Sequence, residues 1–190
     1  MVAKRTIARS RKVALAAVFG ALYAVSVTVL APISFQVYQV RVADILLPLS
    51  ILFGPPAIIG ITLGTFVGNL SSPFGAVDIV GGAVANLVAT FLAWQIGNRR
   101  FRGAWLAGTT AEVLSITMIV GTYLSFLLQI PVWLSLFGVF VGEVIAVSIA
   151  GYLLLRGVSR ALGIRIAPDG TIQNTMPAQQ SDQPSTQANE

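Results

Sequence analysis

The chain contains no cysteine and no histidine, and lysine occurs only at Lys4 and Lys12. The first two absences exclude disulfides, thiol catalysis, proton transfer by histidine and zinc sites of the usual kind. With only these two lysines, no glycine-rich loop can end in the lysine of a phosphate-binding motif. If the protein drives a process with ATP, another chain must therefore bind the nucleotide.

Charge is also scarce, since charged residues make up 10% of the 190 residues and hydrophobic residues make up 55%. A soluble domain has about 25% charged residues. A core formed by a chain of this length could not bury so much apolar surface, so we expect lipid to be the solvent for most of it. The composition predicts one membrane domain, with no room for a second folded unit.

The net charge of +5 raises the question of nucleic-acid binding. The basic residues lie at the ends of apolar runs and not along one helical face, which indicates a membrane-topology signal instead. Residues 1–12 are expected to form a basic cytoplasmic N-terminus. Residues 166–190 are rich in polar residues and proline, and they are expected to form a disordered cytoplasmic tail.

The apolar runs predict an all-α membrane domain of six transmembrane helices over residues 13–156. The runs are residues 13–30, 44–53, 57–70, 78–96, 104–128 and 132–155. A signal peptide is the alternative for the first run, with a weak cleavage site at Val29-Leu30-Ala31. That run is longer than the apolar part of a usual signal peptide and further runs follow it, so we expect a retained helix.

The number of crossings depends on whether residues 44–70 form one helix or two. Gly54-Pro55-Pro56 favours two, because proline lacks an amide proton and biases the preceding residue away from helix. With six helices, eleven of the twelve Lys and Arg residues lie on one side of the membrane, and only Arg41 lies on the other. The positive-inside rule therefore favours six helices with both termini in the cytoplasm.

Two of the predicted helices are too short to cross the membrane unaided. Runs of about 10 and 14 residues reach roughly 15 and 21 Å, whereas the hydrocarbon core is ~30 Å thick. Short spans interrupted by Gly and Pro indicate a solute site. Six crossings place residues 31–43 and 71–77 on the same outer face, next to Asp44 and Asp78. These segments predict the wall of an outward-facing pocket for a polar solute.

The same segments resemble a known family. Gln39-Val40-Arg41-Val42-Ala43-Asp44, followed by Leu47-Pro48, is similar to a Gln-x-Arg-x-x-acid…Leu-Pro pattern of the QueT-type queuosine-precursor transporters. The run from Asn69 to Asp78, followed by Gly82, looks like the second signature of that family. Two positions depart from the pattern expected of the family, with Asp44 in place of Glu and Asn86 in place of Thr.

The resemblance covers residues 13–156 and implies the substrate-binding (S) component of an energy-coupling-factor transporter. Such a six-helix subunit captures a small solute from outside. It docks on a transmembrane coupling subunit that carries two ATPases, so ATP is bound by the partners and no cofactor is expected in this chain. The implied solute is a 7-deazaguanine base or a relative.

Seven residues are expected to contact the solute: Gln39, Arg41, Asp44, Asn69, Ser72, Asp78 and Glu143. A carboxylate such as Asp78 can accept two adjacent N–H donors from a deazaguanine. The alternatives are structural, because Asp78 and Asp44 are also suited to capping helices, and Asn69 and Ser72 to forming turns. Phe35, Tyr38, Phe74 and Tyr123 could stack on a planar base.

Glu112 and Glu143 lie within predicted membrane helices, where acids are costly and usually functional. We expect both to face the bundle interior, and a structural hydrogen bond to another helix is the alternative. A proton-coupled carrier that uses the two acids as a relay is a rival interpretation, as is an S component for another vitamin. An intramembrane enzyme is disfavoured, because no recognisable motif of a metal site or nucleophile accompanies the acids.

The first predicted helix carries small residues at helical spacing, including Ala17 and Ala21. Small faces permit close helix contact. The family resemblance implies that Ala17 and Ala21 dock on the coupling subunit, and packing within the bundle is the alternative.

Overall fold

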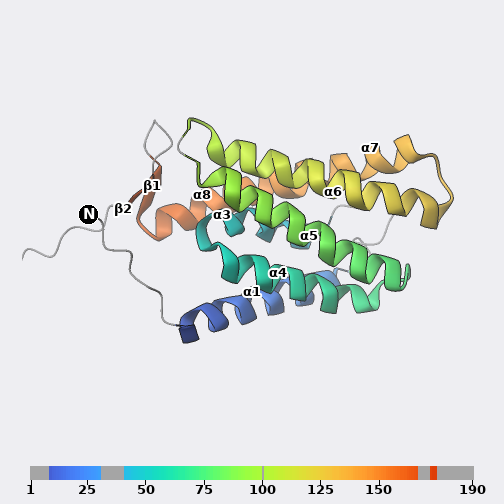
Figure 1. Cartoon of the computed structure of the whole chain (residues 1–190), viewed down its shortest axis with the longest axis horizontal. Helices are drawn as coiled ribbons and strands as arrows, with labels where there is room; N and C mark the ends of the chain where they lie inside the picture. Colours follow the sequence, from blue (N-terminus) through green and yellow to red (C-terminus); the bar gives the residue numbers. More distant parts are fainter. Residues whose placement is uncertain (1–8, 31–40, 100, 167–171, 175–190) are drawn as a thin grey trace, which may run out of the picture.

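The computed structural model describes residues 9–30, 41–99, 101–166 and 172–174 (Figure 1). Within these residues the helices form six rods, and four are long and apolar enough to cross a membrane. The four are α1 (Arg9–Val29), α5 (Ala76–Gly97), α6 (Ala104–Leu128) and a continuous rod of α7 (Val132–Glu143), η3 (Val144–Gly151) and α8 (Tyr152–Ala161). The label η marks segments that are not α-helical, and η3 is a π-helix.

The other two rods are short, as the sequence predicts. The first consists of the 3-10 helix η1 (Val42–Leu49) and one α-helical turn, α3 (Ser50–Phe53). The second is α4 (Pro55–Gly68), which the 3-10 turn η2 (Asn69–Ser71) extends. Gly54 separates the two rods with φ of 61°, a left-handed conformation that favours glycine, and two prolines then begin α4. The predicted break is therefore present.

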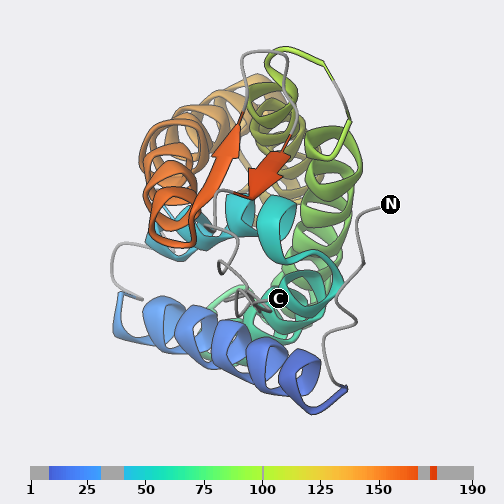
Figure 2. The same cartoon turned by 90° about the vertical axis from the view of Figure 1, so that its left-hand side faces the viewer.

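The rods pack in a bundle with the segment η1–α3 in its middle (Figure 2). Helix α1 packs against α4, α4 against α5, α5 against α6, and α6 against α7. The largest fully buried apolar side chains lie along the bundle interior, and they include Tyr23, Leu47, Ile51, Ile61, Ile116, Leu124 and Leu155. Large apolar side chains also cover the outside, as Leu63 (59% exposed) and Trp133 (70% exposed) show. This distribution suits a bundle surrounded by lipid.

Four segments of the chain lie together at one end of the bundle (Figure 1). These are the start of α1, the turn between α3 and α4, the connection between α5 and α6, and the end of α8. A hydrogen bond of 3.2 Å from Asn98 Nδ2 to the carbonyl of Ile51 ties two of these features together. The described ends of the helical domain therefore lie at the same end of the bundle.

Close contact between α1 and α4 depends on glycine. A Cβ at Gly60 would lie 2.4 Å from the carbonyl oxygen of Ala16, and a Cβ at Gly64 would lie 2.5 Å from that of Gly20. Side chains at these positions would force the helices apart. Part of the small-residue stripe of α1 therefore packs inside the bundle, whereas Ala17 and Ala21 are exposed.

Beyond the last helix, β1 (Ile164–Ile166) pairs antiparallel with β2 (Ile172–Asn174). These short strands lie beyond the predicted all-α domain of residues 13–156, and they occupy four positions of the segment 166–190 that is expected to be disordered. Isoleucine, which favours strands, occurs twice in β1 and once in β2.

Candidate functional site

Asp78 occupies the first turn of α5 and is fully buried. Its Oδ1 lies 3.6 Å from Nη2 of Arg41, which is 3% exposed and precedes η1. The same oxygen accepts a hydrogen bond of 2.6 Å from the Tyr123 hydroxyl of α6. Asp78 Oδ2 has no hydrogen-bond partner among the described residues, and the contacts of Oδ1 join α5 to Arg41 and to α6.

Asn69 stands at the end of α4 and completes this side of the site. Its Nδ2 donates to the main-chain carbonyl of Asp78 at 2.9 Å. A Cβ at Gly82, one turn beyond Asp78, would lie 2.5 Å from this Nδ2 and 3.4 Å from Arg41 Nη1. Glycine at position 82 therefore makes room for both polar side chains, which gives the second sequence signature a physical reason.

Asp44 is held by a second group of buried polar side chains. The Tyr23 hydroxyl of α1 donates a hydrogen bond to Asp44 Oδ1. Asn86 Nδ2 on α5 contacts both the Tyr23 hydroxyl and Thr65 Oγ1 on α4 at 2.7 Å. Through Tyr23 the network links Asp44 to α1, α4 and α5, and Asp44 Oδ2 has no hydrogen-bond partner among the described residues.

Glu143 ends α7, and its buried carboxyl group lies close enough to Asp44 for the two acids to interact electrostatically. Glu112 on α6 is also buried, and its Oε1 lies 3.4 Å from Ser50 Oγ, within reach of the charges of Asp44 and Glu143.

Several polar atoms of this cluster have no hydrogen-bond partner among the described residues. They are Nε and Nη2 of Arg41, Oδ2 of Asp44, Oδ1 of Asn69, Oδ2 of Asp78, Oε2 of Glu112 and Oε2 of Glu143. Buried polar groups are normally satisfied, and an unmade bond costs about 1–3 kcal/mol. The cluster therefore offers donors and acceptors suited to a polar ligand. No group of acids in the described part of the chain has the arrangement of a metal site.

The structure brings together five of the seven expected solute-binding residues: Arg41, Asp44, Asn69, Asp78 and Glu143. Ser72 instead shapes the loop before α5, because its Oγ accepts a hydrogen bond from the Phe74 amide at 3.2 Å. Gln39, Phe35 and Tyr38 lie outside the described residues.

Sequence reasoning missed Tyr23 and Thr65 as members of the site. A signal existed in the four-residue spacing of small and polar residues within apolar helices. Thr65 lies four residues before Asn69, and Asp78, Gly82 and Asn86 follow one another at the same interval. This spacing places such residues on one helical face.

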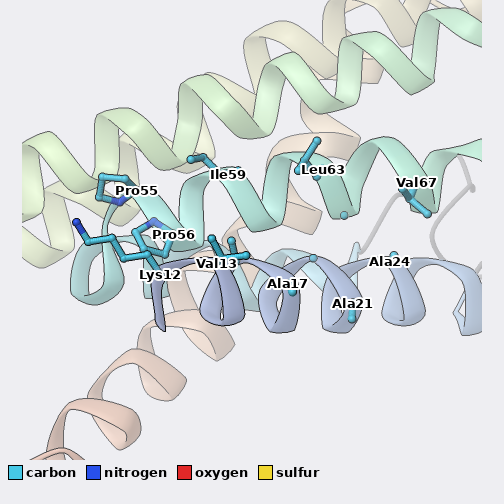
Figure 3. A pocket seen from close by; sticks show the side chains of 13 residues that line it. Lys12, Val13, Ala17, Ala21, Ala24, Pro55, Pro56, Ile59, Leu63 and Val67 are labelled. Atoms are coloured by element: carbon cyan, nitrogen blue, oxygen red, sulfur yellow. The ribbon is translucent and has the colours of Figure 1, made fainter. Parts of the chain in front are cut away.

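A separate groove lies on the outer surface between α1 and α4 (Figure 3). Its volume is about 640 Å³ and its lining is almost entirely apolar. The groove residues include Ala17, Ala21, Ile59, Leu63 and Val67, with Lys12 at one end. Both alanines that were expected to dock a partner thus line a concave apolar surface outside the bundle.

Long apolar helices, an apolar exterior and a buried polar cluster define a multi-pass membrane protein with an internal polar site. A family model described as "QueT transporter" matches residues 13–160, and the chain belongs to that family. The resemblance seen in the sequence is thereby confirmed, and family membership implies a non-enzymatic membrane transport protein. Neither the curated proteins nor the solved structures contained a match.

Proposed function

We propose that this protein is the S component of an energy-coupling-factor transporter and captures a 7-deazaguanine precursor of queuosine from outside the cell. The observation that carries the proposal is the buried cluster of Arg41, Asn69 and Asp78, which unites the two family signatures. Family membership supports transport of such a precursor.

The free atoms of the cluster match the pairing edge of a guanine-like base. Asp78 Oδ2 can accept N–H donors, and Nε and Nη2 of Arg41, which have no hydrogen-bond partner among the described residues, can donate to the base carbonyl. Asn69 Oδ1 offers one further acceptor. A charged donor and a charged acceptor side by side discriminate strongly against apolar solutes, since burying them unpaired is costly.

The proposed topology has six crossings with both termini in the cytoplasm. Basic residues flank the bundle end that holds the start of α1, the α5–α6 connection and the end of α8, and the described ones are Arg9, Arg11, Lys12, Arg99, Arg102, Arg156 and Arg160. The positive-inside rule assigns this end to the cytoplasm. Asn69 follows the C-terminal end of α4, and Asp78 lies in the first turn of α5. Both lie at the other end of the bundle, so the base-binding side is proposed to face outward.

The coupling subunit is proposed to dock on the groove between α1 and α4, with two ATPase subunits attached to it. The side chains of Ala17 and Ala21 on the α1 side of the groove are small, so another helix can approach closely there (Figure 3). Within this proposal, the chain binds the solute and its partners supply ATP hydrolysis.

Binding and uptake are tested separately. Purified protein is titrated with 7-deazaguanine bases and with a panel of vitamins, and uptake is measured in cells with and without the coupling module. We expect saturable binding of a deazaguanine and uptake only with the module. Binding of a vitamin alone would instead identify another S component. Uptake driven by a proton gradient without the module would support a proton-coupled carrier, a rival that the buried acids Glu112 and Glu143 favour.

A further inference from the structure

Tyr123 on α6 is a polar side chain of the cluster to which the proposed function gives no role. Its hydroxyl donates a 2.6 Å hydrogen bond to Asp78 Oδ1, a length typical of a bond to a charged acceptor. Arg41 Nη2 lies 3.6 Å from the same oxygen, which is too long for a hydrogen bond. Among these two contacts, the one from Tyr123 therefore sets the orientation of the carboxylate.

The ring of Tyr123 lies directly against α5. A Cβ at Gly81 would lie 2.9 Å from Tyr123 Cε1 and 3.2 Å from Tyr123 Cδ1. Gly81 follows Asp78 by three residues, and residues at this spacing are neighbours on the surface of a helix. The absence of a side chain at Gly81 therefore lets the ring approach the part of α5 where its hydroxyl can reach Asp78.

The two carboxylate oxygens of Asp78 are unequal as a result. Oδ1 accepts the bond from Tyr123 and faces Arg41, whereas Oδ2 is buried and has no hydrogen-bond partner among the described residues. The terminal torsion of an aspartate side chain is broad, so a carboxylate that is not held can turn. Arginine can then bind both of its oxygens at once. The bond from Tyr123 opposes that rearrangement and keeps Oδ2 available.

We propose that Tyr123 is a positioning residue, which holds Asp78 so that Oδ2 accepts a hydrogen bond from the exocyclic amino group of a guanine-type base. Arg41 pairs with Oδ1 and is proposed to bind the base carbonyl, so Oδ2 serves the other end of the pairing edge, where the amino group lies. This inference rests on the proposed function, because it names the residue that sets base selectivity within the same site.

The test compares 7-deazaguanine with 7-deazahypoxanthine, which has the same rings and carbonyl but lacks the exocyclic amino group. The full-length purified protein is titrated with each base, and the ratio of the two dissociation constants is the readout. A site built to bind a donor rejects an analogue that lacks it, because a buried acceptor is left unpaired. We expect the unmodified protein to bind 7-deazaguanine at least about tenfold tighter.

The variant Tyr123→Phe keeps the ring and removes the hydroxyl that holds Asp78. We expect it to reduce the preference for 7-deazaguanine to about threefold or less, because the carboxylate is free to turn toward Arg41. Tyr152→Phe is the matched control, since it removes the same hydroxyl from α8, where the ring lies 5.9 Å from the guanidinium carbon of Arg156. This control should retain the full preference.

A second variant, Gly81→Ala, tests the position of the ring without changing Tyr123. Alanine favours helix over glycine, yet its Cβ would collide with the ring of Tyr123, so we expect the preference to fall in this variant too. The double variant Gly81→Ala/Tyr123→Phe should lose no more of the preference than Tyr123→Phe alone. Such non-additivity is expected when two substitutions disrupt one interaction.

An unchanged preference in a folded Tyr123→Phe protein would overturn the inference, and thermal unfolding establishes that the variant is folded. An equal loss of affinity for both bases would also overturn it, since a purely structural role lowers both alike. If the unmodified protein binds the two bases equally well, selection of the amino group fails and the proposed function stands. If neither base binds, the proposed function itself fails.

Discussion

The hydroxyl of Tyr123 donates a 2.6 Å hydrogen bond to the carboxylate of Asp78, which joins the C-terminal part of α6 to the first turn of α5. The bond leaves the second carboxylate oxygen of Asp78 without a partner among the described residues. One oxygen of this buried acid is held in place and the other is free to accept a hydrogen bond, so Asp78 is suited to bind a donor group of the solute.

Replacing Asp78 with alanine is expected to weaken binding of a 7-deazaguanine by about 1.5–3 kcal/mol, the value of a hydrogen bond to a charged group. Isothermal titration of the purified variant measures the loss. Ser72→Ala serves as the control, because Ser72 Oγ bonds only to the loop amide of Phe74 among the described contacts. Unchanged affinity in Asp78→Ala would remove Asp78 from the binding site.

Gly82→Ala is expected to lower solute affinity and thermal stability together. The added Cβ would lie 2.5 Å from Asn69 Nδ2, so Asn69 must move away from the carbonyl of Asp78. Gly157→Ala is the matched control, since a Cβ there meets nothing within 4 Å and alanine favours helix by about 1 kcal/mol. A Gly82→Ala protein that melts and binds like the Gly157→Ala protein contradicts this explanation.

Asn86→Ala is expected to lower the free energy of unfolding by about 1–3 kcal/mol, because it removes a buried donor from Tyr23 and Thr65. Thermal melting in detergent measures the change. The control Thr110→Ala removes a hydroxyl that is exposed and bonds only within its own helix. Equal melting temperatures for the two variants would show that the Tyr23–Thr65–Asn86 network adds no stability.

Tryptophan at Ala17 or Ala21 is expected to abolish uptake while leaving solute binding unchanged, because it fills the groove where the coupling subunit is proposed to dock. Val25→Trp, on an exposed part of α1 that does not line this groove, is the control and should transport normally. Uptake and binding are measured in parallel. Loss of both activities in the Ala17 and Ala21 variants would assign these alanines to packing within the bundle.

Membrane topology can be read with single cysteines, since the chain has none of its own. Ser71→Cys and Arg102→Cys place a thiol at exposed positions near opposite ends of the bundle. An impermeant thiol reagent added to intact cells should label position 71 alone, and position 102 should react only after the membrane is opened. Labelling of both positions from outside is incompatible with six crossings and cytoplasmic termini.

Much of the fold could be predicted locally. The length of the apolar runs predicts the four long helices, and Gly54-Pro55-Pro56 predicts the break between the short ones, because chain reach and proline sterics act within a few residues. The change from 3-10 helix to α-helix at Ser50 and the π-helix after Glu143 could not be predicted. Contacts such as that between Gly151 and Pro48 accompany these forms, and they join residues about a hundred positions apart.

The sequence by itself determined that this is a membrane protein, since a chain of this length cannot bury so much apolar surface in its own core. It also indicated four polar residues beside apolar runs, where burial is costly: Arg41, Asp44, Asn69 and Asp78. Only the tertiary structure decided how these residues are paired. It joined Arg41 to Asp78 and Asp44 to Tyr23, and it placed Glu143 within the electrostatic reach of Asp44. It also left Ala17 and Ala21 exposed while Gly20 packs on α4. Hydrogen bonds and close packing act across space, so which side chains meet depends on the arrangement of whole helices.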